Sequence, residues 1–166
     1  MTPMQRFTPA AAAIAAVVLY AGAAVAQSAK DLVGTWQLVS NVLTAPDGKK
    51  TDQFGPDPHG VLYFADNGRY VLSIMRDGLP KFAGNGRMNG SPDENRAIVQ
   101  GSISHFGTYS VADGKIVFHV DYATFPNWNG GTQNRPFKLA GDQLSFFVAA
   151  ASAGGGSSEV VWKRIK

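Results

Sequence analysis

His119 and Asp121 are two side chains capable of proton transfer, and they stand two residues apart in the sequence. Residues at this spacing share one face of a strand, so the imidazole and the carboxylate would be neighbours there. A histidine oriented by a carboxylate can act as a general acid or base. The alternating residues Ile116, Phe118 and Val120 form the more apolar face, however. The preferred interpretation is therefore a solvated His119–Asp121 pair on an outer surface.

Arg135 and Gln133 form a second polar pair, because they share strand parity with Phe137 and Leu139. If that face points inward, Arg135 and Gln133 line a cavity. A buried guanidinium is costly without an anionic partner, and a bound carboxylate would supply one in bidentate geometry. The pattern leaves one alternative open, in which Arg135 lies at a rim and pairs with an acid such as Asp121.

Aromatic side chains provide the candidate walls of a binding site. Trp128 lies in an aromatic loop, residues 124–130, that favours either a ligand wall or a loop anchored by its own tryptophan. Tyr63 and Tyr109 are open to two interpretations as well: core residues with a satisfied hydroxyl, or polar contacts within a pocket. We expect Arg135, Gln133, Trp128, Tyr63, Tyr109 and His119 to be the ligand-binding residues.

The sequence lacks the usual patterns for nucleophilic and metal catalysis. It contains no cysteine and no Gly-x-Ser-x-Gly motif. The three histidines, His59, His105 and His119, are far apart, so neither a metal site nor a cofactor is predicted.

The overall composition describes one lightly charged domain. The chain has 166 residues with 15 Lys and Arg against 12 Asp and Glu, a formal net charge of +3. The sequence shows no basic block of the kind that nucleic-acid binders carry, so nucleic acid is not an expected partner. With 19 glycines, the chain is rich in turns, which favours many short strands.

The N-terminal segment, residues 1–26, has the order of a secretory signal peptide. A single early arginine, Arg6, precedes an apolar run over residues 10–24, and Ala24-Val25-Ala26 matches a small-x-small cleavage site. The run is shorter than the ~20 apolar residues that a membrane-spanning helix needs. We therefore expect cleavage before Gln27, a domain over residues 27–166, a periplasmic or secreted location and no integral membrane association afterwards.

Eight strands separated by turn signals are predicted in that domain. Their ranges are 34–44, 60–65, 70–75, 108–111, 115–121, 133–139, 144–148 and 159–165. The turn Asp66-Asn67-Gly68 and the dipeptide Asp113-Gly114 are hairpin signals, so neighbouring strands should be antiparallel. Eight such strands favour an all-β, up-and-down barrel that holds one small ligand.

One short helix is expected to interrupt the strands over residues 92–105. Ser91 and Glu94 match a capping box, and Pro92 suits the first helical position. Gly107 would then supply the left-handed residue that ends the helix. The predicted apolar stripe consists of Val99, Ile103 and Phe106.

Several motifs make residues 32–166 similar to the bacterial and fungal lipocalin-like domain family. They are Gly-Thr-Trp-Gln-Leu-Val-Ser at 34–40, Gly-Pro-Asp-Pro-His-Gly at 55–60, Phe-Gly-Thr-Tyr at 106–109, Pro-Asn-Trp-Asn-Gly at 126–130, Gln-Asn-Arg at 133–135 and Val-Trp-Lys-Arg at 161–164. The resemblance implies a calycin-type barrel. It also implies that Trp36 on the first strand stacks under Arg164 from the last strand and seals one barrel end.

Three functions are compatible with these features. The first is an exported barrel that binds a small, largely apolar molecule, in one version bearing a carboxylate. The second is an isomerase, cyclase or lyase on the same scaffold that uses His119 or His105 for proton transfer, an idea that rests on fold analogy. The third is an envelope or stress protein with a packed barrel and a surface partner. A cavity above ~300 Å³ would favour binding or catalysis over the third.

Overall fold

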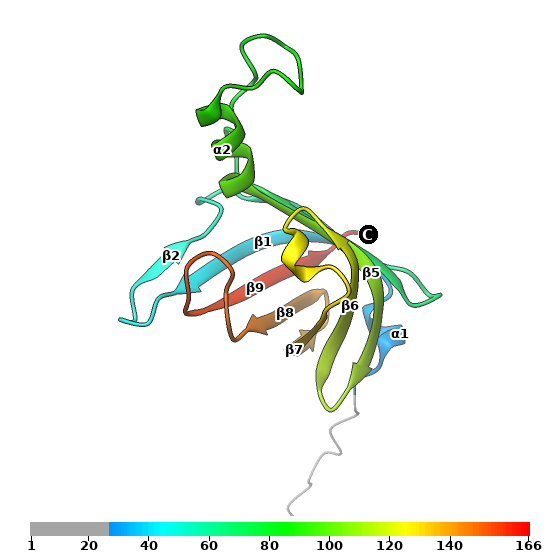
Figure 1. The fold of residues 1–166 in the computed structure, drawn as a ribbon. Helices are drawn as coiled ribbons and strands as arrows, with labels where there is room; N and C mark the ends of the chain where they lie inside the picture. The colour runs from blue at the N-terminus through cyan, green and yellow to red at the C-terminus, as the bar shows by residue number, and fades with distance from the viewer. Residues whose placement is uncertain (1–26) are drawn as a thin grey trace, which may run out of the picture.

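The computed structural model describes residues 27–166 and shows a closed antiparallel barrel with short helices (Figure 1). The predicted signal peptide, residues 1–26, lies outside the described residues. The eight barrel strands are β1 (Gly34–Thr44), β3 (His59–Phe64), β4 (Arg69–Met75), β5 (Ser102–Ala112), β6 (Lys115–Ala123), β7 (Thr132–Ala140), β8 (Gln143–Val148) and β9 (Ser157–Arg164). Each strand pairs with its neighbour in this order, and β9 pairs with β1 to close the barrel. The predicted fold class is confirmed in this respect.

Short connections between the strands explain the up-and-down order. Asp113 and Gly114 both have a positive φ, 51° and 69°, as a type I′ hairpin turn requires, and they join β5 to β6. Gly68, with a φ of 80°, occupies the turn between β3 and β4. A short additional strand, β2 (Lys50–Asp52), pairs with the last residues of β1 and was not predicted.

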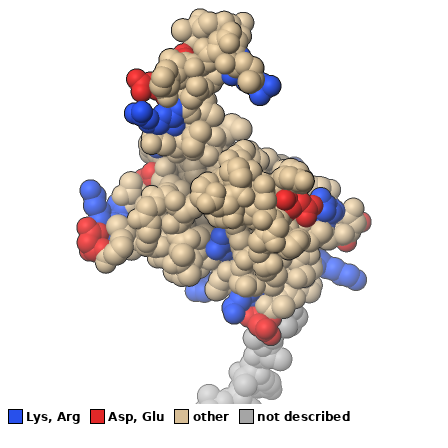
Figure 2. Space-filling view, in the orientation of Figure 1, with Lys and Arg blue, Asp and Glu red and all other residues tan. Residues whose placement is uncertain are grey.

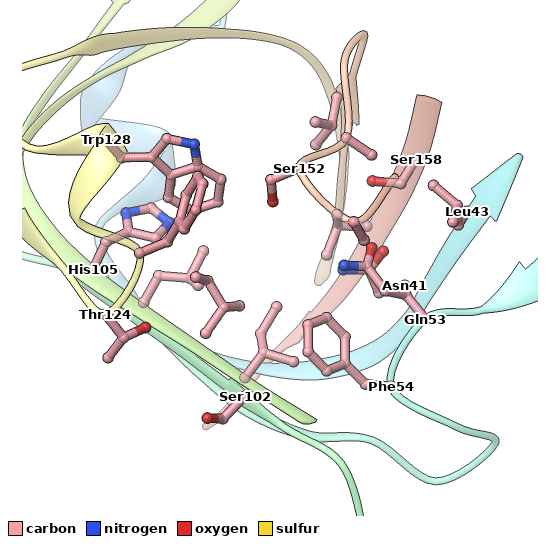
Figure 3. A pocket seen from close by; sticks show the side chains of 18 of the residues that line it. Asn41, Leu43, Gln53, Phe54, Ser102, His105, Thr124, Trp128, Ser152 and Ser158 are labelled. Carbon is pink, nitrogen blue, oxygen red and sulfur yellow. The ribbon is translucent and has the colours of Figure 1, made fainter. Parts of the chain in front are cut away.

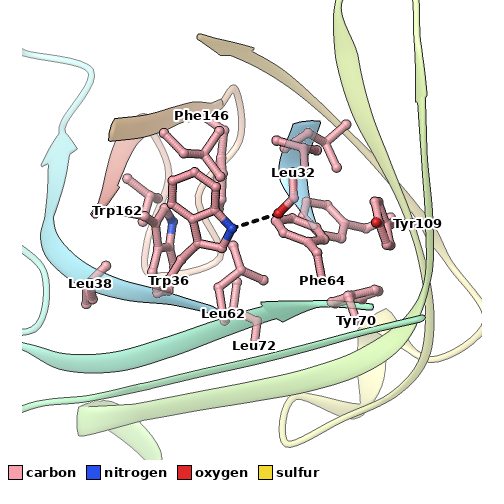
Figure 4. Packing of buried hydrophobic residues seen from close by; sticks show 14 of the residues in the cluster. Leu32, Trp36, Leu38, Leu62, Phe64, Tyr70, Leu72, Tyr109, Phe146 and Trp162 are labelled. Carbon is pink, nitrogen blue, oxygen red and sulfur yellow. Dashed lines mark hydrogen bonds between the residues drawn. The ribbon is translucent and has the colours of Figure 1, made fainter. Parts of the chain in front are cut away.

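One end of the barrel is closed by a dense apolar core (Figure 4). A short helix that the sequence analysis missed, α1 (Ala29–Leu32), precedes β1, and its Leu32 packs into this core. Trp36 is fully buried, and its indole N–H donates to the carbonyl oxygen of Leu32 over 2.8 Å. The guanidinium carbon of Arg164 lies 4.1 Å from the centre of the Trp36 ring. The predicted stacking of Trp36 and Arg164 is thus confirmed.

The helix α2 (Pro92–Gly101) begins as predicted and ends earlier. Ser91 accepts from the backbone N–H of Glu94, and the Glu94 side chain accepts from the backbone N–H of Ser91, which confirms the capping box. The predicted end at His105 is wrong, because β5 starts at Ser102 and runs beside β4. Pairing with β4 over the length of that strand is more favourable for residues 102–105 than the helix that their periodicity predicted.

Two further details of the predicted helix are therefore wrong. Gly107 does not end a helix: it lies within β5, where a Cβ atom would overlap the carbonyl oxygen of His119 on β6. The stripe of Val99, Ile103 and Phe106 does not form one face either, since Val99 is on α2 and is 78% exposed, while Phe106 faces outward from β5.

The opposite end of the barrel is open and carries α2. Figure 1 shows α2 and the segment before it, residues 76–91, standing clear of the barrel at that end. The face of the barrel seen in Figure 2 is largely uncharged, with charged side chains mostly around its edges and on this projecting arm. Within residues 27–166 no helix is both long enough and apolar enough to cross a membrane.

Candidate ligand-binding cavity

A cavity of about 610 Å³ occupies the open half of the barrel (Figure 3). Its volume falls in the range of about 300–1,000 Å³ that is usual for small-molecule sites. Apolar side chains from several strands and from the short helix η1 (Pro126–Trp128) provide much of the wall. They include Leu72, Ile74, Ile103, Phe118, Trp128 and Phe146. Such a wall suits a largely apolar molecule.

Four of the residues singled out in the sequence line this cavity together: His105, Trp128, Gln133 and Arg135. They come from β5, η1 and β7, so closure of the sheet brings together positions up to thirty residues apart. Trp128 packs edge-on against His105, with ring centres 5.5 Å apart. Trp128 therefore anchors its loop and also lines the cavity.

The other predicted ligand-binding residues lie elsewhere. Tyr63 is 47% exposed on the outer wall, because its neighbours in β3, Leu62 and Phe64, face inward. His119 is exposed as well, within reach of Thr132 on β7. Tyr109 points into the closed end, where its hydroxyl donates to the carbonyl oxygen of Ala65 over 2.9 Å. The prediction that these three residues line the cavity is wrong.

His119 and Asp121 lie on the outer wall, the interpretation that the sequence favoured over an acid–base unit. Asp121 forms an ion pair with Arg69 over 2.9 Å on the outer wall. The register of β5 and β6 shifts here, because Val120 pairs with Gly107 and Tyr122 with Phe106, which leaves Asp121 without a partner residue on β5. Both side chains thus lie on a solvated outer surface.

Arg135 is a cation in the cavity that has no acidic partner among residues 27–166. Its Nη2 donates to Oε1 of Gln133 over 2.7 Å, and the two side chains are partly buried. Burial lowers the pKa of the guanidinium from its ordinary value, while the nearby Tyr70 phenol raises it. The alternative pairing with Asp121 does not form, and that carboxylate pairs with Arg69. The positive charge of Arg135 is thus available to a ligand.

Tyr70 and His105 form a buried hydrogen-bonded pair beside Arg135. The Tyr70 hydroxyl lies 2.8 Å from Nδ1 of His105, and both side chains are at least 95% buried. Burial raises the pKa of Tyr70, so its hydroxyl stays protonated. If this hydroxyl donates to Nδ1, the neutral imidazole carries its proton on Nε2; if it accepts from Nδ1, Nε2 carries the lone pair. Figure 3 shows the His105 ring beside the cavity that it lines.

Tyr70 was missed by the sequence analysis, although a signal for it exists. It alternates with Leu72 and Ile74 along β4, and all three side chains are buried. The same alternation places Tyr63 outside, so strand parity alone separates the two tyrosines.

The pH dependence of stability should reveal the buried imidazole. Burial, and to a smaller extent the charge of Arg135, lower the pKa of His105 from 6.5 to about 4. The unfolded chain therefore binds this proton more tightly than the folded protein does. The stabilisation is complete above pH ~6.5 and is lost as the pH falls to ~4, by about 2–3 kcal/mol.

Urea unfolding of wild type and of His105→Gln across this pH range measures the effect. Glutamine keeps an acceptor for Tyr70 and does not titrate, while the carboxylates titrate in both proteins. The difference in unfolding free energy between the two proteins should fall as the pH falls from ~6.5 to ~4. A difference that is independent of pH would show that His105 is protonated as readily in the folded protein as in the unfolded chain.

Hydrogen-bond donors dominate the polar side of the cavity around Arg135. The guanidinium of Arg135, the imidazole of His105 and the amide of Gln133 all line the cavity, and each of these groups can donate to an oxygen atom. No aspartate or glutamate is among the residues that line the cavity. Within the described part of the chain, no three His, Asp or Glu side chains gather as a metal site would require. The arrangement can hold an anionic or strongly polar oxygen group against aromatic walls.

Comparison with known proteins agrees with this architecture. The chain is similar to the 4'-hydroxy-3'-methoxypropiophenone carrier protein of Aspergillus oryzae, with 27% identity over 79 residues that cover 43% of this chain and 71% of that protein. Residues 33–165 match the lipocalin-like domain family, and this segment contains all eight barrel strands. The protein therefore belongs to the lipocalin-like domain family.

Proposed function

We propose that this protein is a carrier that binds a small, largely aromatic or apolar molecule by an acidic oxygen group inside the barrel. The observation that carries the proposal is the unneutralised Arg135 in a cavity whose other walls are largely apolar. A carboxylate is the natural partner, because it accepts two parallel hydrogen bonds from a guanidinium. His105 and Gln133 line the same cavity, and each can present an N–H donor to a ligand.

The similar protein from Aspergillus oryzae supports the carrier role by its name. Its named cargo is an aromatic ketone that carries a hydroxyl and a methoxy group. An aromatic cargo suits the rings of Phe118, Trp128 and Phe146 in this cavity. The packed barrel of the third hypothesis is disfavoured, because the cavity exceeds the ~300 Å³ that separates a filled barrel from a binding barrel.

A carrier is preferred to an enzyme on this scaffold for a specific reason. A histidine that acts as a general base must accept a proton and become an imidazolium, whereas burial and the charge of Arg135 lower the pKa of His105 to about 4. His119, the other candidate, lies on the outer wall. The polar side of the cavity is therefore equipped to hold an oxygen group.

Matched pairs of acids and their methyl esters test the proposal. We expect wild-type protein to bind cinnamate and decanoate at least about ten-fold more tightly than the corresponding esters, the scale of a charge-assisted hydrogen bond. Isothermal titration calorimetry gives both affinities, and 4'-hydroxy-3'-methoxypropiophenone serves as a neutral aromatic reference. Equal affinities for acid and ester would contradict the proposal.

We also propose that the protein acts outside the cytoplasm after removal of residues 1–26. The apolar run and the Ala24-Val25-Ala26 site support this proposal. N-terminal sequencing of protein from its own host should find Gln27 as the first residue, in the fraction released from the periplasm or the medium. An intact Met1 on membrane-bound protein would contradict it.

A further inference from the structure

Across the cavity from His105, we infer a second polar subsite, formed by Asn41 and Ser158, that binds a hydroxyl group at the far end of the cargo. This inference rests on the proposed carrier function and narrows its cargo to molecules with two polar ends. Figure 3 shows Asn41 and Ser158 on one side of the cavity and His105 and Trp128 on the other.

The burial of these two side chains is the first observation. Asn41 is 7% exposed and Ser158 is 3% exposed, and both line the cavity. The side-chain oxygen of Asn41 has no hydrogen-bond partner among residues 27–166. Most buried polar side chains in folded proteins are hydrogen-bonded, so an unpaired buried carboxamide oxygen on a residue that lines a cavity indicates a missing partner.

The strand register places the two side chains together. Asn41 pairs with Val160 and Leu43 pairs with Ser158, so Asn41 and Ser158 are diagonal neighbours on the inner face of β1 and β9. Diagonal neighbours across antiparallel strands lie about 7–8 Å apart at their Cα atoms, and their side chains can converge on one small group. Gln53 adds another amide at the rim of the same wall.

The order of strands around the barrel sets the two polar subsites apart. Starting from β1, the strands follow as β3, β4, β5, β6, β7, β8 and β9. His105 on β5 and Arg135 on β7 are therefore on the far wall from the β1–β9 seam that carries Asn41 and Ser158. The apolar side chains of Leu72 on β4 and Phe146 on β8 lie on strands between these two walls. A cargo that satisfies both walls has an apolar middle.

A hydroxyl group matches the chemistry of the second subsite. A carboxamide both donates and accepts, and so does the serine hydroxyl, whereas neither carries a charge. An alcohol or phenol can donate to one of them and accept from the other. Rotation about the last bond of the asparagine side chain exchanges its oxygen and nitrogen within a broad, two-fold torsional preference. The inferred cargo is thus a small hydroxylated carboxylic acid with an aromatic or aliphatic spacer.

Ligand pairs that differ by one hydroxyl test the inference. The pairs are cinnamate with para-coumarate, phenylacetate with its para-hydroxy derivative, and octanoate with its omega-hydroxy derivative. Isothermal titration calorimetry compares wild type with Asn41→Leu and Ser158→Ala. Asn134→Leu on the exposed face of β7 makes the same chemical change outside the cavity and is the matched control.

We expect at least one hydroxylated member to bind wild type about ten-fold more tightly than its parent acid, the scale of one buried hydrogen bond. Asn41→Leu and Ser158→Ala should each reduce the ratio of the two affinities toward one, with the affinity for the parent acid unchanged. Asn134→Leu should leave the preference intact. Without ligand, Asn41→Leu should raise the melting temperature by about 2–4 °C, because a buried carboxamide oxygen without a partner is removed.

Three results would overturn the inference in different ways. If wild type binds the parent acids and prefers none of the hydroxylated members, the two side chains hold water only and the carrier proposal stands. If the preference survives in both variants, the hydroxyl binds elsewhere. If wild type binds no acid of any pair, the proposed function itself fails and this inference fails with it.

Discussion

Replacing Trp36 with alanine should lower the free energy of unfolding by about 3–5 kcal/mol, the range for removal of a large buried aromatic side chain. The indole is fully buried in the closed end and makes two specific contacts there, a hydrogen bond to Leu32 and the stacked guanidinium of Arg164. The substitution leaves a cavity under Arg164, whose two Nη atoms remain bound to the carbonyl oxygens of Val33 and Asp31. The surrounding chain therefore cannot collapse freely to fill it.

Chemical denaturation in urea measures this loss, with two variants for comparison. Arg164→Ala should have a smaller effect, since the stacking of a guanidinium on an indole contributes about 0.5–2 kcal/mol. Trp128→Ala is the matched control, because Trp128 is only partly buried and lies at the open end. A Trp36→Ala protein as stable as Trp128→Ala would show that the closed end does not depend on this tryptophan.

Arg135→Met should weaken the binding of an acidic ligand by about 2–5 kcal/mol, the scale for breaking a buried charge pair. Methionine keeps an unbranched apolar stem of similar length and removes the charge. The loss should be confined to acids, so that their methyl esters bind wild type and variant alike. Without ligand, the variant should be as stable as wild type or more stable, since a partly buried cation without an acidic partner is removed.

Titration calorimetry with cinnamate, decanoate and their esters measures this prediction. The matched control is Arg69→Met, which removes an arginine from the outer wall, where its partner is Asp121. Arg69→Met should leave all four affinities unchanged. If Arg135→Met lost the same affinity for acids and for esters, the variant would have perturbed the shape of the cavity. The charge of Arg135 would then not be what binds the acid.

Local features of the sequence were sufficient to predict the barrel itself. Alternating apolar residues, as in Leu62 and Phe64, mark the inward faces of the strands, and positive-φ turn residues such as Asp113-Gly114 join them. The capping box of Ser91 and Glu94 predicted where α2 begins. The stacking of Trp36 and Arg164 was implied by the family resemblance and is confirmed. The first three features act over a few residues, so a chain without its tertiary structure already displays them.

Strand pairing decided what the local pattern left open. Residues 102–105 follow a helix and share its periodicity, yet they pair with β4 as the start of β5. This pairing brings His105 within hydrogen-bond distance of Tyr70. The alternation along its strand already indicates that Tyr63 points outward. The same alternation did not decide whether Arg135 or His119 points inward, and only the closed barrel does so.

The cavity depends on contacts that no local pattern encodes. The carboxylate of Asp121 forms its ion pair with Arg69, which is far away in the sequence, and not with Arg135. Asn41 and Ser158 meet only where the last strand pairs with the first. The sequence by itself determined which segments form strands and which of their faces are apolar. Only the tertiary structure decided which polar side chains share the interior, because their burial and their partners depend on the closed sheet as a whole.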